Sequence, residues 1–164
     1  MTGTPHRDRL LWDLNTIRKE LEEEAGRITP EELDWAPAEG MKTLRELLAE
    51  IGTMEALTVS WLADRKQADW QETWNGILCP GEGREAVMAR LAQIRQRTLA
   101  YLEAATEELL ETPEPLPPSW VQYFPSPELE PEELVRWIGK HEYYHLGQII
   151  TCRWIRGDNP YKRG

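Results

Sequence analysis

Four segments of the chain repeat apolar side chains at intervals of three and four residues, and this pattern limits the folds open to it. The spacing places the apolar residues on one face of an α-helix, because a helix turns once every 3.6 residues. The segments run from about Pro5 to Ala25, Lys42 to Lys66, Arg84 to Leu110 and Pro131 to Arg156. Helices with one apolar face bury it against each other, so we predict an all-α, up-down four-helix bundle.

Two connections between these segments differ from short loops. Residues 67–83 contain Trp70 and Trp74 together with glycine and proline, and we predict a linker there. Residues 112–131 carry seven of the chain's twelve prolines, which disfavours a helix or a central strand in this long connection before the last helix. Connections as long as residues 112–131 are often functional lids or rigid crossovers. Both connections could shape the entrance to a site, and the alternative for the linker with Trp70 and Trp74 is that it plugs the end of the bundle. No segment shows the pattern of a strand.

Length and composition indicate one domain over residues 1–164. The formal net charge is −10 and the basic residues are scattered among acids, so we expect neither nucleic acid nor an anionic membrane as a partner. Cys79 and Cys152 are too few for a disulfide framework. The sequence shows neither a secretory signal nor an apolar run of about 20 residues, and we expect a cytoplasmic protein with free thiols.

The strongest chemical signal lies in the last helical segment. Two of the chain's three histidines, His141 and His145, are four residues apart. Side chains at this spacing lie on one helical face about 6 Å apart, close enough to share a metal ion. Both fall on the apolar stripe, so they are expected to point into the bundle. Two core histidines satisfied by hydrogen bonds are the alternative, but an inward pair at this spacing favours metal.

A metal site normally needs a third protein ligand, and Glu50 is the candidate. It falls within the apolar stripe of the second helical segment. A carboxylate among apolar side chains is costly unless a cation compensates it, and a metal ion would do so. The alternative is that Glu50 lies at the edge of the stripe beside an arginine or lysine. The pattern alone leaves these two interpretations open.

Two further interpretations of the last helical segment are disfavoured. Residues 141–145, HEYYH, match the H-E-x-x-H motif of zincin proteases, in which Glu142 would be a general base. Neither a later glutamate nor a later histidine completes such a site. Cys152 lies about 10 Å along the helix axis from His145, too far to bind the same ion, and we interpret it as a buried apolar residue. Trp137, Tyr144 and Gln148 could line a pocket, with core packing as the alternative.

Residues 141–149, HEYYHLGQI, resemble the closing H-x-x-x-H-x-G-Q-I helix of the DinB/YfiT superfamily of metal-binding four-helix bundles. Residues 43–51, TLRELLAEI, resemble its second-helix motif, and residues 35–37, WAP, resemble its W-x-P loop. The resemblance implies one divalent ion held by position 50 and the two histidines. The family usually has a third histidine where this chain has Glu50. Two imidazoles and a carboxylate suit Zn or Ni, and also Mn or Fe(II).

The resemblance also implies an activity. Characterised members tend to be metal-dependent enzymes that use low-molecular-weight thiols. We therefore expect a divalent-metal-dependent thiol S-transferase or hydrolase that acts on a small molecule and forms a homodimer. Glu142 and Tyr144 are the candidate catalytic residues. The alternative is a non-catalytic metal- or ligand-binding dimerisation module, which the change from histidine to Glu50 favours.

Overall fold

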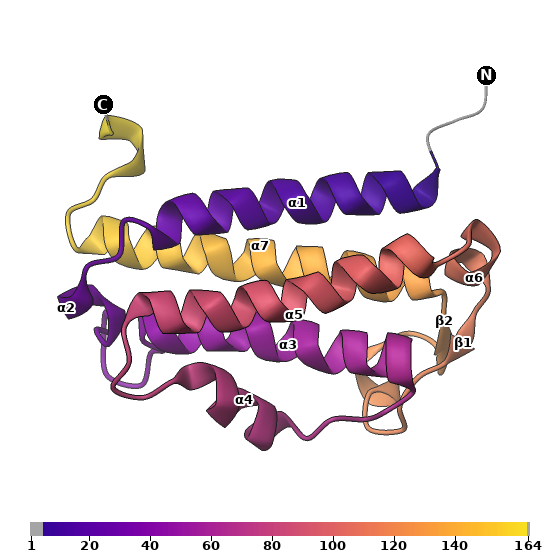
Figure 1. Cartoon of the computed structure of the whole chain (residues 1–164). Helices are drawn as coiled ribbons and strands as arrows, with labels where there is room; N and C mark the ends of the chain where they lie inside the picture. Colours follow the sequence, from indigo (N-terminus) through magenta and orange to yellow (C-terminus); the bar gives the residue numbers. More distant parts are fainter. Residues whose placement is uncertain (1–4, 164) are drawn as a thin grey trace.

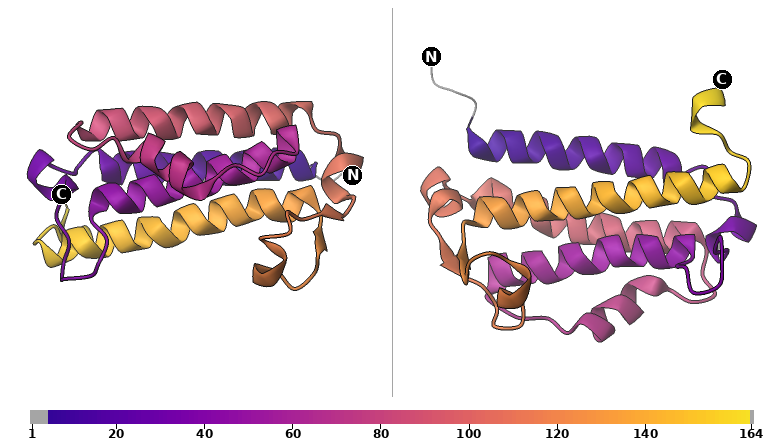
Figure 2. Two further views of the ribbon diagram at one scale, coloured as in Figure 1. Left: turned by 90° about the horizontal axis from the view of Figure 1, so that it is seen from below. Right: turned by 180° about the vertical axis from the view of Figure 1, so that it is seen from behind.

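Four long helices lie side by side in the computed structural model, which describes residues 5–163 (Figure 1). They are α1 (His6–Ala25), α3 (Leu44–Asp64), α5 (Arg84–Ala104) and α7 (Pro131–Ile155). Helix α3 packs against both α5 and α7, and α1 packs against α7 (Figure 2). The predicted all-α four-helix bundle is confirmed, and the predicted ends of α1, α3 and α7 agree to within two residues.

Residues 67–83, predicted as a linker, contain a further helix, α4 (Trp70–Leu78). The carboxylate of Asp69 caps it by accepting a hydrogen bond from the Glu72 N–H at 2.8 Å. Helix α4 packs against α3 and buries Ile77 in the core. It carries the chain back along the bundle, so that α5 starts at the same end as α3 (Figure 1). The four long helices therefore run up, down, down and up, and the predicted up-down order is wrong because α4 adds a return pass between α3 and α5.

The third predicted helix, expected to end at Leu110, is interrupted. Helix α5 ends at Ala104, and Ala105 has an extended backbone with φ −72° and ψ 139°. The hydroxyl of Thr106 then accepts a hydrogen bond from the Leu109 N–H and starts a new short helix, α6 (Glu107–Glu111). The apolar spacing continues across this break, so periodicity alone did not reveal it.

The proline-rich segment turns back on itself at one end of the bundle. Strands β1 (Glu114–Pro115) and β2 (Glu128–Leu129) pair antiparallel, and a 3-10 helix, η1 (Val121–Tyr123), lies between them. The expectation of no strand is therefore wrong for this short pair, which has no counterpart in the hydrophobic pattern. Short helices α2 (Pro30–Leu33) and η2 (Pro160–Lys162) complete the described chain. None of the described helices is long and apolar enough to cross a membrane.

A layer of buried charge divides the apolar core into two clusters along the bundle axis. Each long helix contributes one charged side chain to this layer, and the four are Arg18, Glu55, Arg95 and Glu142. Both arginines bridge both glutamates, and the hydroxyl of Thr98 donates to Glu55 at 2.7 Å. Because every member is paired, the layer ties all four helices together and fixes how they align along the axis.

Candidate metal centre

Helix α7 brings His141 and His145 together as their spacing predicts. Their Nε2 atoms lie 3.1 Å apart, and the two rings meet edge to face. His145 is buried and His141 is half-buried. The two histidines face the groove between α3 and α7.

Helix α3 supplies the carboxylate. A capping box fixes its start, because the Thr43 hydroxyl accepts from the Glu46 N–H at 3.2 Å and the Glu46 carboxylate accepts from the Thr43 N–H at 2.7 Å. Two turns into this helix, Glu50 Oε2 lies 3.9 Å from His145 Nε2. One ligand atom from each of Glu50, His141 and His145 lies within 4.8 Å of the other two.

The alternative environment for Glu50 is present as well. The ammonium group of Lys42, just before the capping box, forms an ion pair with the Glu50 carboxylate. The same ammonium lies 5.7 Å from the ring centroid of Trp74. Glu50 therefore faces two histidines and a lysine at once, and Lys42 compensates its charge in this structure.

The local environment keeps both imidazoles in the form that binds metal. Burial lowers the pKa of His141 to about 4, with a further lowering by His145 and an opposing effect of Glu50. Burial also lowers the pKa of His145, against the opposing effects of Gln148 and Glu50. Neutral imidazole has a lone pair to donate. The Nδ1–H of His145 donates to Gln148 Oε1 at 2.7 Å, which leaves the lone pair on Nε2, facing His141 and Glu50.

The three side chains fit a divalent ion. Two ligand atoms that each lie about 2.0–2.1 Å from one ion in a tetrahedral site are about 3.4 Å apart. The imidazole nitrogens, 3.1 Å apart, are close to that separation, and the 3.9 Å between His145 Nε2 and Glu50 Oε2 needs to shorten by about 0.5 Å. The remaining pair, His141 and Glu50, needs at most a small side-chain rotation. Two imidazoles and one carboxylate are a donor set that Zn, Ni, Mn and Fe(II) accept.

An open cavity of about 560 Å³ adjoins these three side chains. Trp137, Lys140, Tyr144 and Gln148 also line it, together with Lys42. The cavity therefore has room for a small molecule beside the three candidate ligands. Lys42 and Lys140 are the lining residues that sequence reasoning missed, because a lone surface lysine carries no signal in the pattern.

The two candidate catalytic residues lie in different places. Tyr144 lines the cavity and is largely exposed. Glu142 does not line it: the side chain is 1% exposed and accepts hydrogen bonds from Arg18 at 2.7 Å and from Arg95. Its position assigns Glu142 to the buried charged layer and does not favour a role in chemistry at the cavity. Arg18 and Arg95, which interrupt apolar stripes, were the signal for this layer.

Two other groups are separate from this cavity. Cys152 is buried, burial raises its pKa, and it lines a different hollow. His6, Glu107 and Glu111 also offer ligand atoms within 4.8 Å of one another. However, His6 Nδ1 is bonded to Glu132 Oε2 at 2.5 Å, and Glu111 is largely exposed. We assign no site to this second group.

The fold and this cluster define a class of protein: a four-helix bundle whose last helix presents two histidines to a carboxylate on the second long helix. The sequence profile of the DinB superfamily matches residues 13–149, and the chain belongs to that superfamily. The resemblance of the histidine segment is thus confirmed. A search among curated proteins gives no significant match.

Solved structures share this fold. A DinB-like protein, YjoA, from Bacillus subtilis is 18% identical, with a TM-score of 0.67 over 92% of this chain and 94% of that one. An uncharacterised protein from Escherichia coli UTI89 is 13% identical, with a TM-score of 0.68 over 95% of this chain and 98% of that one. At these identities the likeness establishes the fold.

Proposed function

We propose that this protein binds one divalent metal ion through Glu50, His141 and His145 and acts as a metal-dependent enzyme on a small molecule. The observation that carries the proposal is the convergence of three donor groups from two helices, within 4.8 Å, at the wall of an open cavity. Zn or Ni is the proposed ion, with Mn and Fe(II) as further candidates. The family resemblance supports a thiol S-transferase or a hydrolase.

The chemistry follows from the groups around the cavity. A divalent ion held there supplies a Lewis acid that lowers the pKa of a water molecule or a thiol toward neutrality. Lys42 and Lys140 line the cavity and outnumber Glu50, the one carboxylate among its described lining residues, which favours an anionic substrate or an ionised thiol. Tyr144 carries the one hydroxyl among the described lining residues, and we propose it as the proton donor or acceptor.

An activity screen tests this proposal. Protein loaded in turn with Zn, Ni and Mn is assayed for conjugation of the cysteine thiol to 1-chloro-2,4-dinitrobenzene, which forms an S-aryl bond and releases chloride, and for hydrolysis of p-nitrophenyl acetate. We expect turnover that needs metal and is lost in His145→Ala. Tyr144→Phe should retain metal and lower kcat by about 100-fold, in the range of general acid–base catalysis. Equal turnover in His145→Ala and wild type would show that the reaction does not take place at this site.

A second candidate function is a non-catalytic ligand-binding module. The ion pair between Lys42 and Glu50 favours it, because the pair compensates the carboxylate without an ion. In this case metal addition would leave both turnover and the unfolding temperature unchanged. In either case we propose a cytoplasmic homodimer that binds neither nucleic acid nor anionic membranes, in line with the net charge of −10. Light scattering during size-exclusion chromatography tests the dimer.

A further inference from the structure

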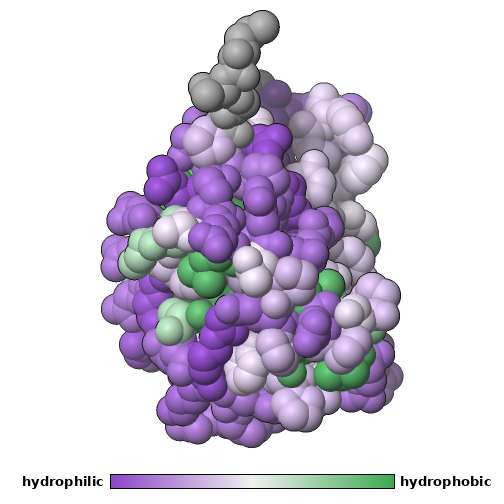
Figure 3. All heavy atoms as spheres, turned by 90° about the vertical axis from the view of Figure 1, so that its right-hand side faces the viewer, coloured by the Kyte–Doolittle hydropathy of each residue, from purple (hydrophilic) through white to green (hydrophobic). Residues whose placement is uncertain are grey.

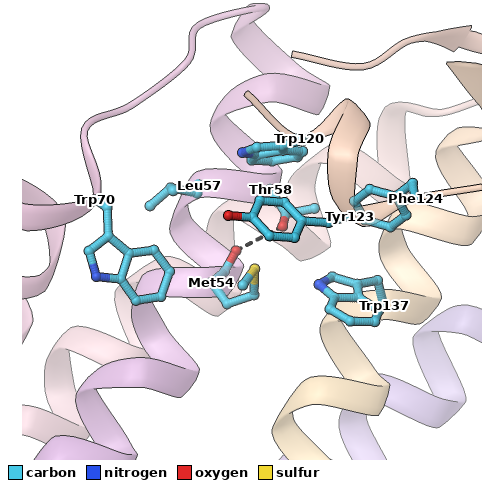
Figure 4. Close-up of a pocket in the computed structure, with 8 residues that line it drawn as sticks. All are labelled: Met54, Leu57, Thr58, Trp70, Trp120, Tyr123, Phe124 and Trp137. Carbon is cyan, nitrogen blue, oxygen red and sulfur yellow. Dashed lines mark hydrogen bonds between the residues drawn. The ribbon is translucent and has the colours of Figure 1, made fainter. Parts of the chain in front are cut away.

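A second cavity, of about 390 Å³, is lined mainly by aromatic side chains (Figure 4). Aromatic rings from three separate parts of the chain surround it. Trp70 comes from the start of α4, Trp120, Tyr123 and Phe124 from the proline-rich segment, and Trp137 from α7. Met54, Leu57 and Thr58 of α3 form its floor. None of these described lining residues is charged.

The two cavities are neighbours along the groove between α3 and α7. Trp137 lines both of them. Met54 follows Glu50 by four residues, and Trp137 precedes His141 by four. Because α3 and α7 run in opposite directions, both steps lead the same way along the groove, by one helical turn or about 6 Å (Figure 1). The aromatic cavity therefore begins one turn from the three candidate ligands.

The lining suits an uncharged ring system. The hydroxyl of Thr58 already donates to the backbone carbonyl of Met54 at 2.8 Å, so it offers no free donor to a ligand. An anionic group would find no basic side chain among these residues, and its desolvation would be costly. A cation could lie over the ring faces, but Lys42 and Lys140 line the adjoining cavity and disfavour a second positive charge beside them. Flat indole and phenyl faces stack on other rings, and Phe124 already meets Trp137 edge to face with centroids 5.6 Å apart. The volume lies within the range of small-ligand pockets.

Several of these aromatic rings remain exposed to solvent. Trp70 and Trp137 are each 38% exposed, and Tyr123 is 75% exposed. The end of the bundle seen in Figure 3 carries mostly hydrophilic and near-neutral residues, with the most hydrophobic residues in separate groups. A cavity of about 390 Å³ has room for one small ring system, so these features favour a small molecule.

We propose that the aromatic cavity holds an uncharged aromatic group of the same small molecule whose polar group reaches Glu50, His141 and His145. The polar end rests on the proposed metal site, whereas the ring end depends on the aromatic cavity alone. The substrate class thereby narrows to molecules in which a ring and a polar reacting group are separated by about one helical turn, roughly 6 Å.

Binding of a neutral fluorescent probe, N-phenyl-1-naphthylamine, tests the ring end without any metal. We expect one probe per chain, with a fluorescence increase and displacement by n-propylbenzene. Tyr123→Ala and Trp120→Ala should weaken binding at least fivefold. Trp12→Ala is the matched control, because Trp12 is exposed on α1 and does not line the cavity, and it should stay within twofold of wild type. Circular dichroism checks that each variant folds. Because Tyr123 is exposed, Tyr123→Ala should disturb the fold less than Trp120→Ala.

Displacement of the probe by 3-phenylpropane-1-thiol, with and without Zn²⁺, tests the polar end. Zn²⁺ should lower, by at least tenfold, the concentration of the thiol that displaces half of the probe. The concentration of n-propylbenzene that displaces half of the probe should not change. His145→Ala should abolish the Zn²⁺ effect and keep probe binding. Absence of probe binding, or equal binding in Tyr123→Ala, overturns the aromatic site. Zn²⁺ that binds without helping the thiol overturns the joint occupation by one molecule. Failure to bind Zn²⁺ at all overturns the proposed function and the polar end together, while the ring end is still decided by the probe.

Discussion

Lys42 and a metal ion compete for the same carboxylate, so replacing Lys42 with glutamine should strengthen metal binding. Its ammonium pairs with Glu50, and Glu50 Oε2 also lies 3.9 Å from His145 Nε2. The side chain of Lys42 is 47% exposed, whereas that of Glu50 is 16% exposed. Lys42 can therefore turn into solvent when an ion binds, at the cost of its ion pair.

Two terms set the size of this effect. Breaking an ion pair of this exposure costs about 0.2–1 kcal/mol, and the partial burial of Glu50 favours the upper end. The displaced ammonium, about 9 Å from a divalent ion, adds a screened repulsion of about 0.3 kcal/mol. With the ion pair at the upper end of its range the sum is about 1–1.3 kcal/mol, so Lys42→Gln should tighten metal binding by about 5- to 9-fold.

Competition with a chromophoric zinc chelator measures this affinity. Lys140→Gln is the matched control, because Lys140 lines the same cavity but lies 3.7 Å from Glu133 and makes no ion pair with Glu50. It loses the same charge but keeps the pair, so its affinity should rise by less than about twofold. Equal affinities for Lys42→Gln and Lys140→Gln would refute competition at Glu50.

Three further predictions concern stability. Glu55→Gln removes a partner from two buried arginines and should lower the free energy of unfolding, measured in urea, by about 3–5 kcal/mol. The control Asp64→Asn breaks an exposed ion pair and should lower it by less than about 1 kcal/mol. Similar losses of unfolding free energy in the two variants would contradict the stabilising role of the buried charged layer. Burial raises the pKa of Glu55, but the two arginines outweigh it and hold the pKa below its usual 4.5. The contribution of Glu55 to stability is therefore present above pH 4.5 and is lost as the pH falls below that value. Acid should lower the free energy of unfolding less in Glu55→Gln than in wild type, and parallel pH profiles of the two proteins would contradict this. A Cβ at Gly52 would lie 2.9 Å from Leu91 Cδ1, whereas one at Gly147 would meet nothing within 4 Å. In thermal unfolding, Gly52→Ala should therefore destabilise the protein by about 1–2 kcal/mol and Gly147→Ala should stabilise it by about 0.5–1 kcal/mol. The reverse order of stability would contradict the close packing of α3 at Gly52.

The positions of the long helices along the sequence and the helix faces that carry the candidate ligands were predictable because both depend on local periodicity. The spacing of His141 and His145 determines that they share a face. The spacing of Glu50 places it in the apolar stripe of its helix, but left open whether it lies at the edge beside a basic residue, and the structure shows Lys42 there. The proposal that the three candidate ligands bind metal remains a prediction.

Features that depend on contacts between distant segments were not predictable in this way. The pattern placed Glu142 beside the histidines, but its partners Arg18 and Arg95 lie 124 and 47 residues away in the sequence. Helix α4 is short and is stabilised by packing on α3, so its own periodicity is too brief to stand out. Lys42 reaches Glu50 across the capping box, eight residues away, through a long flexible side chain whose direction no pattern fixes.

The metal content of untagged protein tests the central claim most directly. Elemental mass spectrometry is applied to wild type, Glu50→Ala and His145→Ala, each as purified and after exposure to Zn, Ni and Mn followed by desalting. A site with three protein ligands predicts close to one equivalent of a single divalent ion in wild type, and its loss in both variants. Loss in His145→Ala alone would remove Glu50 from the site, and wild type that retains no metal after exposure to all three ions would contradict the metal centre itself.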